Sequence, residues 1–201
     1  MIKKQTNAFT IIEILVWILI FSMGIVSVFS LIISTLNINE NNKNYIIAAN
    51  LAKEQIELVR NIRDSNFKKV QIYNQINPSF DGDNRVVFEL WKCYTIENDF
   101  SSSASFPVKV VPQNNCPEKW KFPPDSLSIC IDSDNLYTHD CNWNEKIPFF
   151  KYIEILPVEY KDGSDVKTIE NSFKVVSRVV RNSRWYREFE IVSIFTDFKR
   201  F

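Results

Sequence analysis

Four cysteines are the residues of this chain with the greatest capacity for chemistry. Cys93, Cys116, Cys130 and Cys141 all lie in the C-terminal part of the sequence. Four cysteines allow three pairings, and their spacing does not choose among them. Outside a membrane we expect two disulfides that brace a loop-rich region. A zinc site is the less favoured alternative, because there is no C-x-x-C pair and His139 is the sole imidazole. Free thiols are the third possibility.

Acidic residues between the last two cysteines raise the question of a metal site. The run 132–135 and Asp140 could offer oxygens to calcium, but an EF-hand loop would need glycine and glutamate where Tyr137 and Trp143 stand. We therefore expect an ordinary polar turn and no bound metal. His139 beside Asp140 has the composition of a catalytic dyad, yet no G-x-S-x-G or reactive-cysteine signature accompanies it. The sequence predicts a surface histidine, no enzymatic activity and no cofactor.

The charge balance narrows the classes of partner. The chain has 201 residues with 24 basic and 24 acidic side chains, so its formal net charge is zero. A nucleic-acid-binding protein would present a basic face to the phosphates, so we expect none here. Only 3 glycines occur, far apart, which argues against a glycine-rich phosphate loop.

The apolar residues are concentrated near the N-terminus. From Phe9 to Leu36 the sole ionisable side chain is Glu13. As a helix, the run from Ile11 to Leu36 would be about 39 Å long, enough to cross a hydrocarbon core of about 30 Å. A secretory signal peptide would have an apolar core of about 7–15 residues and a small-residue cleavage site after it, and neither fits. We therefore predict a membrane-spanning helix over residues 9–36.

The charges that flank this helix predict its orientation. Lys3 and Lys4 precede it, and no cation follows it until Lys43. By the positive-inside rule the N-terminus stays in the cytoplasm and the C-terminal part is extracytoplasmic.

Glu13 is unusual in such a helix. A carboxylate in a spanning helix costs about 2.5–3.5 kcal/mol at the bilayer centre and less near the interface. Glu13 either lies close enough to the headgroups to be solvated or has a specific partner.

The residues around Glu13 suggest a partner. The run 3–13 reads K-K-Q-T-N-A-F-T-I-I-E and resembles the cleavage and methylation motif of type IV prepilins and pseudopilins. The resemblance implies a leader peptide, residues 1–8, which a prepilin peptidase removes between Ala8 and Phe9 before it methylates the new amine. It also implies that Glu13 neutralises the Phe9 amine of a neighbouring subunit, which fixes the register of a filament. Breaking such a buried pair typically costs about 3–5 kcal/mol.

Two positions depart from the commonest pattern of that family. Ala8 stands where glycine is usual, and Ser30 stands about where many major pilins carry a helix proline. Together with the cysteines, these departures favour a minor pilin-like subunit.

A second helical pattern follows the apolar run. Apolar residues recur at three- and four-residue intervals on one face, which predicts an amphipathic extension over residues 37–64 with an exposed Glu57–Arg60 pair. These apolar residues are Tyr45, Ala48, Ala49, Ala52, Ile56, Val59 and Ile62. The alternative is a break at Asn37–Asn42, where asparagines weaken helix propensity. The apolar face requires a cover, and the C-terminal domain, residues 65–201, is the candidate.

The C-terminal domain reads mainly as β structure. Strands are predicted over 86–91, 149–159, 173–180 and 185–195, and the last three form an antiparallel meander with turns at Asp162-Gly163 and Asn182-Ser183. Residues 98–143 look irregular. The result is an α+β fold, a long N-terminal helix on an antiparallel sheet with a disulfide-stapled loop region, which is the pilin-like arrangement that the motif implies.

Three functions agree with these features to different degrees. The first is a structural subunit of a type IV pilus or secretion pseudopilus, whose partners are the prepilin peptidase, other pilin-like subunits and membrane lipid. The second is an unprocessed, single-pass extracytoplasmic binding protein. The third is a membrane-anchored enzyme, which lacks a recognisable catalytic constellation.

Overall fold

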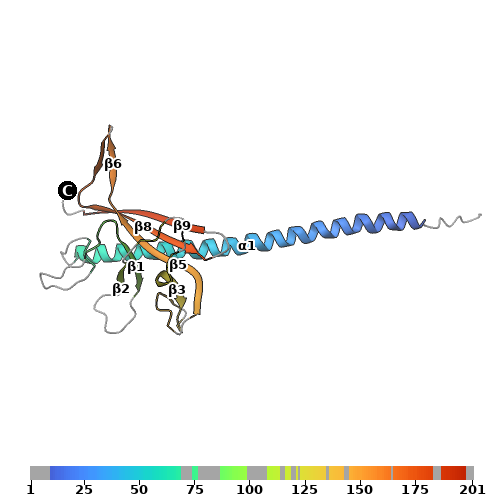
Figure 1. Cartoon of the computed structure of the whole chain (residues 1–201), viewed down its shortest axis with the longest axis horizontal. Helices are drawn as coiled ribbons and strands as arrows, with labels where there is room; N and C mark the ends of the chain where they lie inside the picture. The colour runs from blue at the N-terminus through green and yellow to red at the C-terminus, as the bar shows by residue number, and fades with distance from the viewer. Residues whose placement is uncertain are drawn as a thin grey trace, which may run out of the picture. The chain divides into compact units, whose positions relative to one another are not determined.

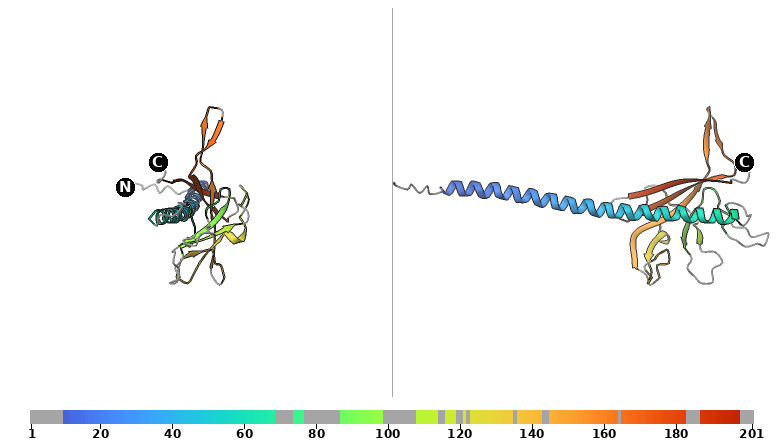
Figure 2. Two further views of the ribbon diagram at one scale, coloured as in Figure 1. Left: turned by 90° about the vertical axis from the view of Figure 1, so that its left-hand side faces the viewer. Right: turned by 180° about the vertical axis from the view of Figure 1, so that it is seen from behind.

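The computed structural model describes residues 10–68, 74–76, 87–98, 108–113, 116–118, 121, 123–134, 136–142, 145–163, 165–182 and 187–197. The chain divides into two compact units, one ending at Asn44 and the other beginning at Tyr45. Figures 1 and 2 show the chain from three sides.

One helix, α1, covers Ile11–Lys68 and has 58 residues. It is continuous through residues 37–42, so the alternative of a break there is wrong. Just after this stretch, Asn44 Nδ2 donates to the carbonyl oxygen of Glu40 at 2.7 Å, a hydrogen bond within the helix. The helix ends four residues beyond the predicted stop at Asp64. Near its end the Asn66 side chain donates to the carbonyl oxygen of Gln75 at 2.6 Å.

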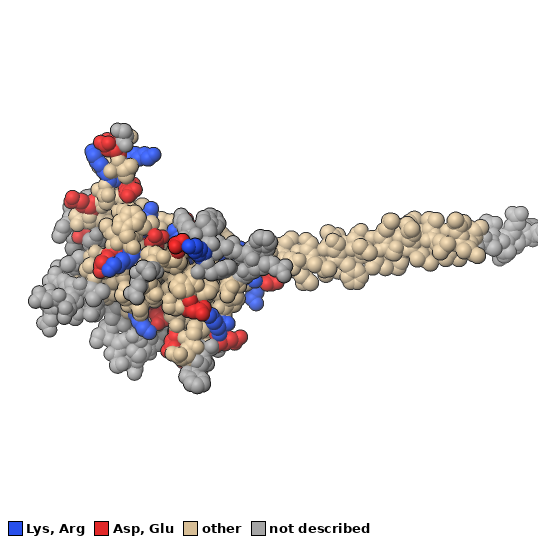
Figure 3. All heavy atoms as spheres, in the orientation of Figure 1, with Lys and Arg blue, Asp and Glu red and all other residues tan. Residues whose placement is uncertain are grey.

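Residues 11–36 of α1, in the first unit, present apolar side chains on all sides. The helix contains an 18-residue window with a mean hydropathy of 2.6, none of it buried, so by length and composition this helix could span a membrane. Figure 3 shows this stretch almost without charged side chains on the face in view.

The second unit contains an antiparallel sheet of seven strands and a separate two-stranded ribbon. The seven strands are β1 (Cys93–Asn98), β2 (Val108–Gln113), β3 (Ser128–Ile131), β4 (Tyr137–Thr138), β5 (Glu145–Leu156), β8 (Ser172–Arg181) and β9 (Arg187–Thr196). Along one path the order is β2-β1-β5-β3-β4, and β8 pairs with both β5 and β9. The predicted antiparallel pairing of the last three long strands is therefore confirmed. The turn predicted at Asp162-Gly163 instead joins the two strands of the separate ribbon, and Ser183 of the other predicted turn lies outside the described residues.

The two faces of β5 pack against different parts of the chain. Side chains alternate between the faces of a strand. Phe149 packs with Ala52 of α1, and Ile153 packs with Val59 of α1. Phe150 and Tyr152 point the other way, into a cluster of Cys93, Leu127, Phe150, Tyr152 and Val180. The sheet is thus covered by α1 on one face and by the loop segment with the 3-10 turn Asp125–Leu127 on the other.

The amphipathic half of α1 buries the predicted face. Ala48, Ala52, Ile56, Val59 and Ile62 are buried, and Leu51 and Leu58 join them. Tyr45, which was predicted on this face, is 63% exposed, although its ring meets Phe189 edge-on at 5.1 Å between centroids. The exposed Glu57–Arg60 ion pair is present at 2.7 Å.

Two predictions for the β region are wrong in detail. No strand covers the described residues of 86–91; Val87 makes only an isolated bridge to Gln75, and the strand begins at Cys93. The extended run is interrupted at Trp91, whose φ of 64° turns the backbone. Residues 98–143 are also more regular than predicted, because β2, β3, β4 and the 3-10 turn lie there.

The ribbon interrupts the meander between β5 and β8. It consists of β6 (Glu159–Asp162) and β7 (Asp165–Thr168), all of whose residues are exposed. In Figures 1 and 2 this ribbon extends away from the larger sheet. Gly163, at its tip, has a φ of 67°, in the left-handed region that favours glycine.

Candidate functional site

Glu13 lies in the first turn of α1. The helix begins at Ile11, and the N–H groups of Glu13 and Ile14 donate to the carbonyl oxygen of Thr10 at 3.0 and 3.3 Å. Thr10 and Glu13 have the spacing of a capping box, a signal that the sequence reasoning missed. A carboxylate in a first turn is favoured by the helix dipole. The first turn of the helix therefore stabilises the Glu13 carboxylate even without a partner from another subunit. Ala8 and Phe9, the predicted cleavage site, lie outside the described residues.

Three polar side chains in the apolar part of α1 form hydrogen bonds within the helix. The hydroxyls of Ser22, Ser27 and Thr35 donate to carbonyl oxygens three or four residues earlier, at 2.8 to 2.9 Å. In an apolar medium an unsatisfied polar group is costly, so these bonds make the segment compatible with lipid.

A shallow apolar groove interrupts this surface at Gly24. It is lined by Ile20, Phe21, Gly24, Ile25, Val28 and Phe29. A Cβ at Gly24 would have no neighbour within 4 Å in the chain. The groove is therefore open to an apolar group from another molecule, whether a side chain or a lipid tail.

The four cysteines form the two disulfides that were expected. Cys93 pairs with Cys116, and Cys130 pairs with Cys141. The first lies on the sheet face away from α1, beside Leu127 and Tyr152. The second ties β3 to the segment that contains His139. The zinc and free-thiol alternatives are therefore excluded for these cysteines.

The acidic run after β3 forms the expected polar turn. Asp132 Oδ1 accepts the N–H groups of Asp134 and Leu136, each at 2.9 Å. Among the described residues, no group of three His, Cys, Asp or Glu side chains is placed to hold a metal ion.

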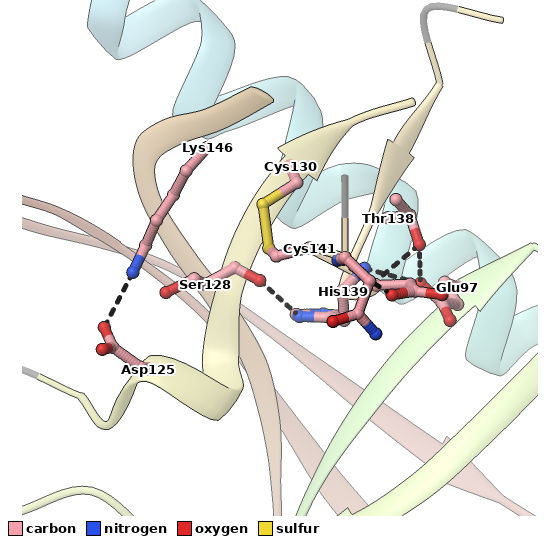
Figure 4. The surroundings of a disulfide bond; sticks show 10 residues. Glu97, Asp125, Ser128, Cys130, Thr138, His139, Cys141 and Lys146 are labelled. Atoms are coloured by element: carbon pink, nitrogen blue, oxygen red, sulfur yellow. Dashed lines mark hydrogen bonds and ion pairs between the residues drawn. A yellow bond between two sulfur atoms is a disulfide. The ribbon is translucent and has the colours of Figure 1, made fainter. Parts of the chain in front are cut away.

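His139 is not the surface histidine that the sequence suggested. Its side chain is half-buried beside Glu97 of β1, and its Nδ1 lies 3.0 Å from the carbonyl oxygen of Ser128 (Figure 4). Because a carbonyl only accepts, Nδ1 carries the proton and Nε2 of the neutral ring is an acceptor. Burial, and then the Lys151 ammonium, lowers the pKa of His139 to about 4. The ring therefore stays neutral near pH 7.

The Glu97 carboxylate accepts the hydrogen bonds that hold the side chains around His139 together. Its Oε2 accepts the His139 N–H at 2.9 Å and the Thr138 hydroxyl at 3.2 Å, and Lys109 Nζ lies 3.2 Å from its Oε1. Burial alone would raise the pKa of Glu97, but the His139 N–H and the Lys109 ammonium outweigh it, so the pKa lies below its ordinary value. Glu97 is thus an ionised, nearly buried carboxylate.

Lys151 links this region to α1. Its side chain is fully buried in β5, and its Nζ lies 3.7 Å from Glu54 Oε2 on the helix. Burial lowers the pKa of Lys151, while Glu54 and Glu97 oppose the change. Its Nζ has no hydrogen-bond partner among the described atoms.

A second buried cation lies on the opposite face of the sheet. Arg178 of β8 forms ion pairs with Glu154 of β5 and with Glu188 and Glu190 of β9. Burial would lower the pKa of Arg178, but the Glu188 and Glu154 carboxylates outweigh it and raise the pKa. Three strands are thereby joined through one guanidinium.

The structure brings some of the predicted site residues together and reveals others that were not predicted. The cysteines meet in pairs, whereas no other predicted site residue lies beside Glu13 in the part of the chain that the structure describes. Sequence reasoning missed Glu97, Lys151 and Arg178; the only available signal was a charged residue at an inward position of a β-like run. Comparison with protein-family models, curated proteins and solved structures finds no significant match to this chain.

Proposed function

We propose that this chain is a pilin-like subunit of a type IV pilus or secretion pseudopilus, held in the membrane by α1 and assembled through it. The observation that carries the proposal is residues 11–36 of α1: an exposed apolar helix whose single carboxylate, Glu13, lies in its first turn. The resemblance of residues 3–13 to the prepilin motif supplies the processing step and the partner for Glu13.

The second unit agrees with this proposal. A filament subunit needs a folded domain that continues from its membrane anchor. Here the same helix continues without a break and packs its other half on the sheet, with two disulfides that suit an extracytoplasmic location.

The first test is mass spectrometry of the N-terminus of the protein purified from membranes of a host with a prepilin peptidase. The proposal expects a chain that begins at methylated Phe9. Retention of Met1 to Ala8 in a stably inserted protein would instead support a single-pass, membrane-anchored binding protein.

A second test addresses assembly through Glu13. Glu13→Gln keeps the size of the side chain and removes the charge, so membrane insertion should persist while incorporation into filaments falls. Glu40→Gln, on the same helix outside the apolar run, is the matched control and should assemble normally. Unchanged incorporation of Glu13→Gln would contradict the register role.

The groove at Gly24 gives a third test. Because a side chain at this position meets nothing in its own chain, Gly24→Leu should leave insertion and the soluble domain intact. Small residues allow close approach of membrane helices, so the substitution should lower filament incorporation. The control is Val26→Leu, which exchanges one aliphatic side chain for another two positions away from Gly24. Normal assembly of Gly24→Leu would show that lipid, not a neighbouring helix, occupies the groove.

A further inference from the structure

One edge of β5 is shared by two strands that separate from each other. β3 pairs with the N-terminal part of β5, with Ser128 opposite Phe150. β1 pairs with the C-terminal part, with Tyr94 opposite Ile153. Lys151 lies in β5 between these two pairings. We call the space between β1 and β3 beside Lys151 the fork.

The fork is closed by the segment 137–139. Thr138 and His139 both donate to Glu97 on the β1 side, while the His139 ring donates to Ser128 on the β3 side. The His139 residue thus bridges the two strands, as Figure 4 shows. Three buried polar atoms near this junction have no hydrogen-bond partner among the described atoms: His139 Nε2, Lys151 Nζ and Ser128 Oγ. A buried polar atom without a hydrogen-bond partner destabilises the folded state.

The covalent bond Cys130–Cys141 is the strongest tether of this closing segment. β4, which lies in this segment, has two residues, and they pair with Cys130 and Ile131. Two pairs give little stability by themselves. Cys130 is fully buried in β3, and Cys141 follows His139 by two positions. The disulfide therefore holds the His139 bridge in place.

Three charged groups act on His139, and a fourth pairs with one of them. They are Glu97 of β1, Lys109 of β2, Lys151 of β5 and, next to Lys151, Glu54 of α1. Two are acidic and two are basic, so a neutral imidazole leaves the cluster balanced and an imidazolium adds an unpaired charge.

We propose that Cys130–Cys141 is a redox latch: the bond keeps the fork closed over Lys151, and its reduction opens the fork and loosens α1 around Glu54. The reductant is a dithiol, which attacks the half-buried Cys141 sulfur. Each protein sulfur gains one electron and one proton, and the dithiol becomes its own disulfide. The Cys93–Cys116 disulfide braces the other face of the sheet and has no such effect. The inference does not depend on assembly into a filament.

The test uses the full chain in detergent micelles and needs no resonance assignment, because His139 is the sole histidine. The imidazole is titrated by NMR in the oxidised protein and in Cys130→Ser/Cys141→Ser. The oxidised protein should titrate near the pKa of about 4, and the variant should move towards the ordinary 6.5. Reduction of the wild type by a dithiol should give the same change.

Cys93→Ser/Cys116→Ser is the matched control and should keep the low pKa of His139. Hydrogen exchange separates an open fork from an unfolded domain. In Cys130→Ser/Cys141→Ser, amides of β8 such as Val176 and Val179 should stay protected, while amides near Glu54 exchange faster. An unchanged pKa, an equal change in the control, or loss of protection throughout the sheet would each overturn the proposal.

Discussion

The Ser177 hydroxyl of β8 donates to Gln55 Oε1 of α1 at 2.7 Å, and both side chains are fully buried. This bond joins residues 122 positions apart in the sequence. It fixes one polar point in this interface, beside the Lys151–Glu54 pair, so it helps to select the rotation of α1 on the sheet.

Removal of the Ser177 hydroxyl should destabilise the domain. Ser177→Ala leaves the Gln55 oxygen buried without its donor, which typically costs about 1–3 kcal/mol. The double variant Gln55→Leu/Ser177→Ala should cost less than the sum of the single changes, because no polar group is then stranded. The free energy of unfolding in denaturant measures both. Ser193→Ala on the neighbouring strand is the control, with an expected change within about 0.5 kcal/mol.

The two partners of the Lys151–Glu54 pair should differ in their effects. Lys151 is fully buried, whereas the Glu54 side chain is 31% exposed. Glu54→Gln leaves a buried ammonium short of its nearest partner, a change for which losses of about 3–5 kcal/mol are typical. Lys151→Met removes the buried charge and leaves a carboxylate that water can reach, so its cost should be smaller. Equal unfolding free energies for the two variants would refute this asymmetry.

Stability should fall as the pH drops from about 6.5 to 4, in part because of His139. The unfolded chain binds a proton at the ordinary pKa of 6.5, while the folded chain does so only near 4. Between these values protonation favours the unfolded state, and each unit of difference in pKa corresponds to about 1.4 kcal/mol. The contribution is fully present above the unfolded pKa and is lost on acidification.

His139→Asn isolates this contribution, because its amide can still donate to the Ser128 carbonyl. The carboxylates of the chain titrate alike in both proteins. The difference in unfolding free energy between wild type and variant should therefore shrink as the pH falls. Parallel pH profiles would assign the acid sensitivity to other groups.

The β6–β7 ribbon should respond to mutation independently of the sheet. A Cβ-branched residue at Gly163, where φ is 67°, is strained. Gly163→Val should therefore speed hydrogen exchange in β6 and β7 with little change in the global unfolding free energy. Gly163→Asn tolerates the left-handed conformation and should stay close to wild type. A large global loss in Gly163→Val would mean that the ribbon is part of the cooperative core.

Helical periodicity and β-branched runs were sufficient to predict the larger elements. The apolar face of α1 was visible as a three- and four-residue repeat, and β5, β8 and β9 as long β-branched runs. The strand at 86–91 was misplaced because Trp91 looks favourable for a strand but adopts a positive φ. This conformation is held by long-range bonds, since the Trp91 N–H donates to the Ile155 carbonyl at 2.7 Å.

The buried polar cluster was beyond sequence reasoning for a different reason. Glu97, His139 and Lys151 are each ordinary polar residues in the sequence, and only the divergence of β1 from β3 brings them together. The pairing of the cysteines could not be predicted for the same reason, because it depends on which strands are neighbours. The local prediction of a turn at Asp132 succeeded since its bonds reach only four residues along the chain.

The apolar cluster that covers α1 has a consequence for the order of folding events. Ile56, Val59 and Ile62 are sealed by Phe173 and Phe195, whose rings stack at 5.4 Å between centroids. Contacts between such distant segments close slowly, because a long loop must first be ordered. The apolar face of the helix is not completely covered until residue 195 has been synthesised. Apolar surface that is exposed in this way during synthesis favours aggregation of the nascent chain.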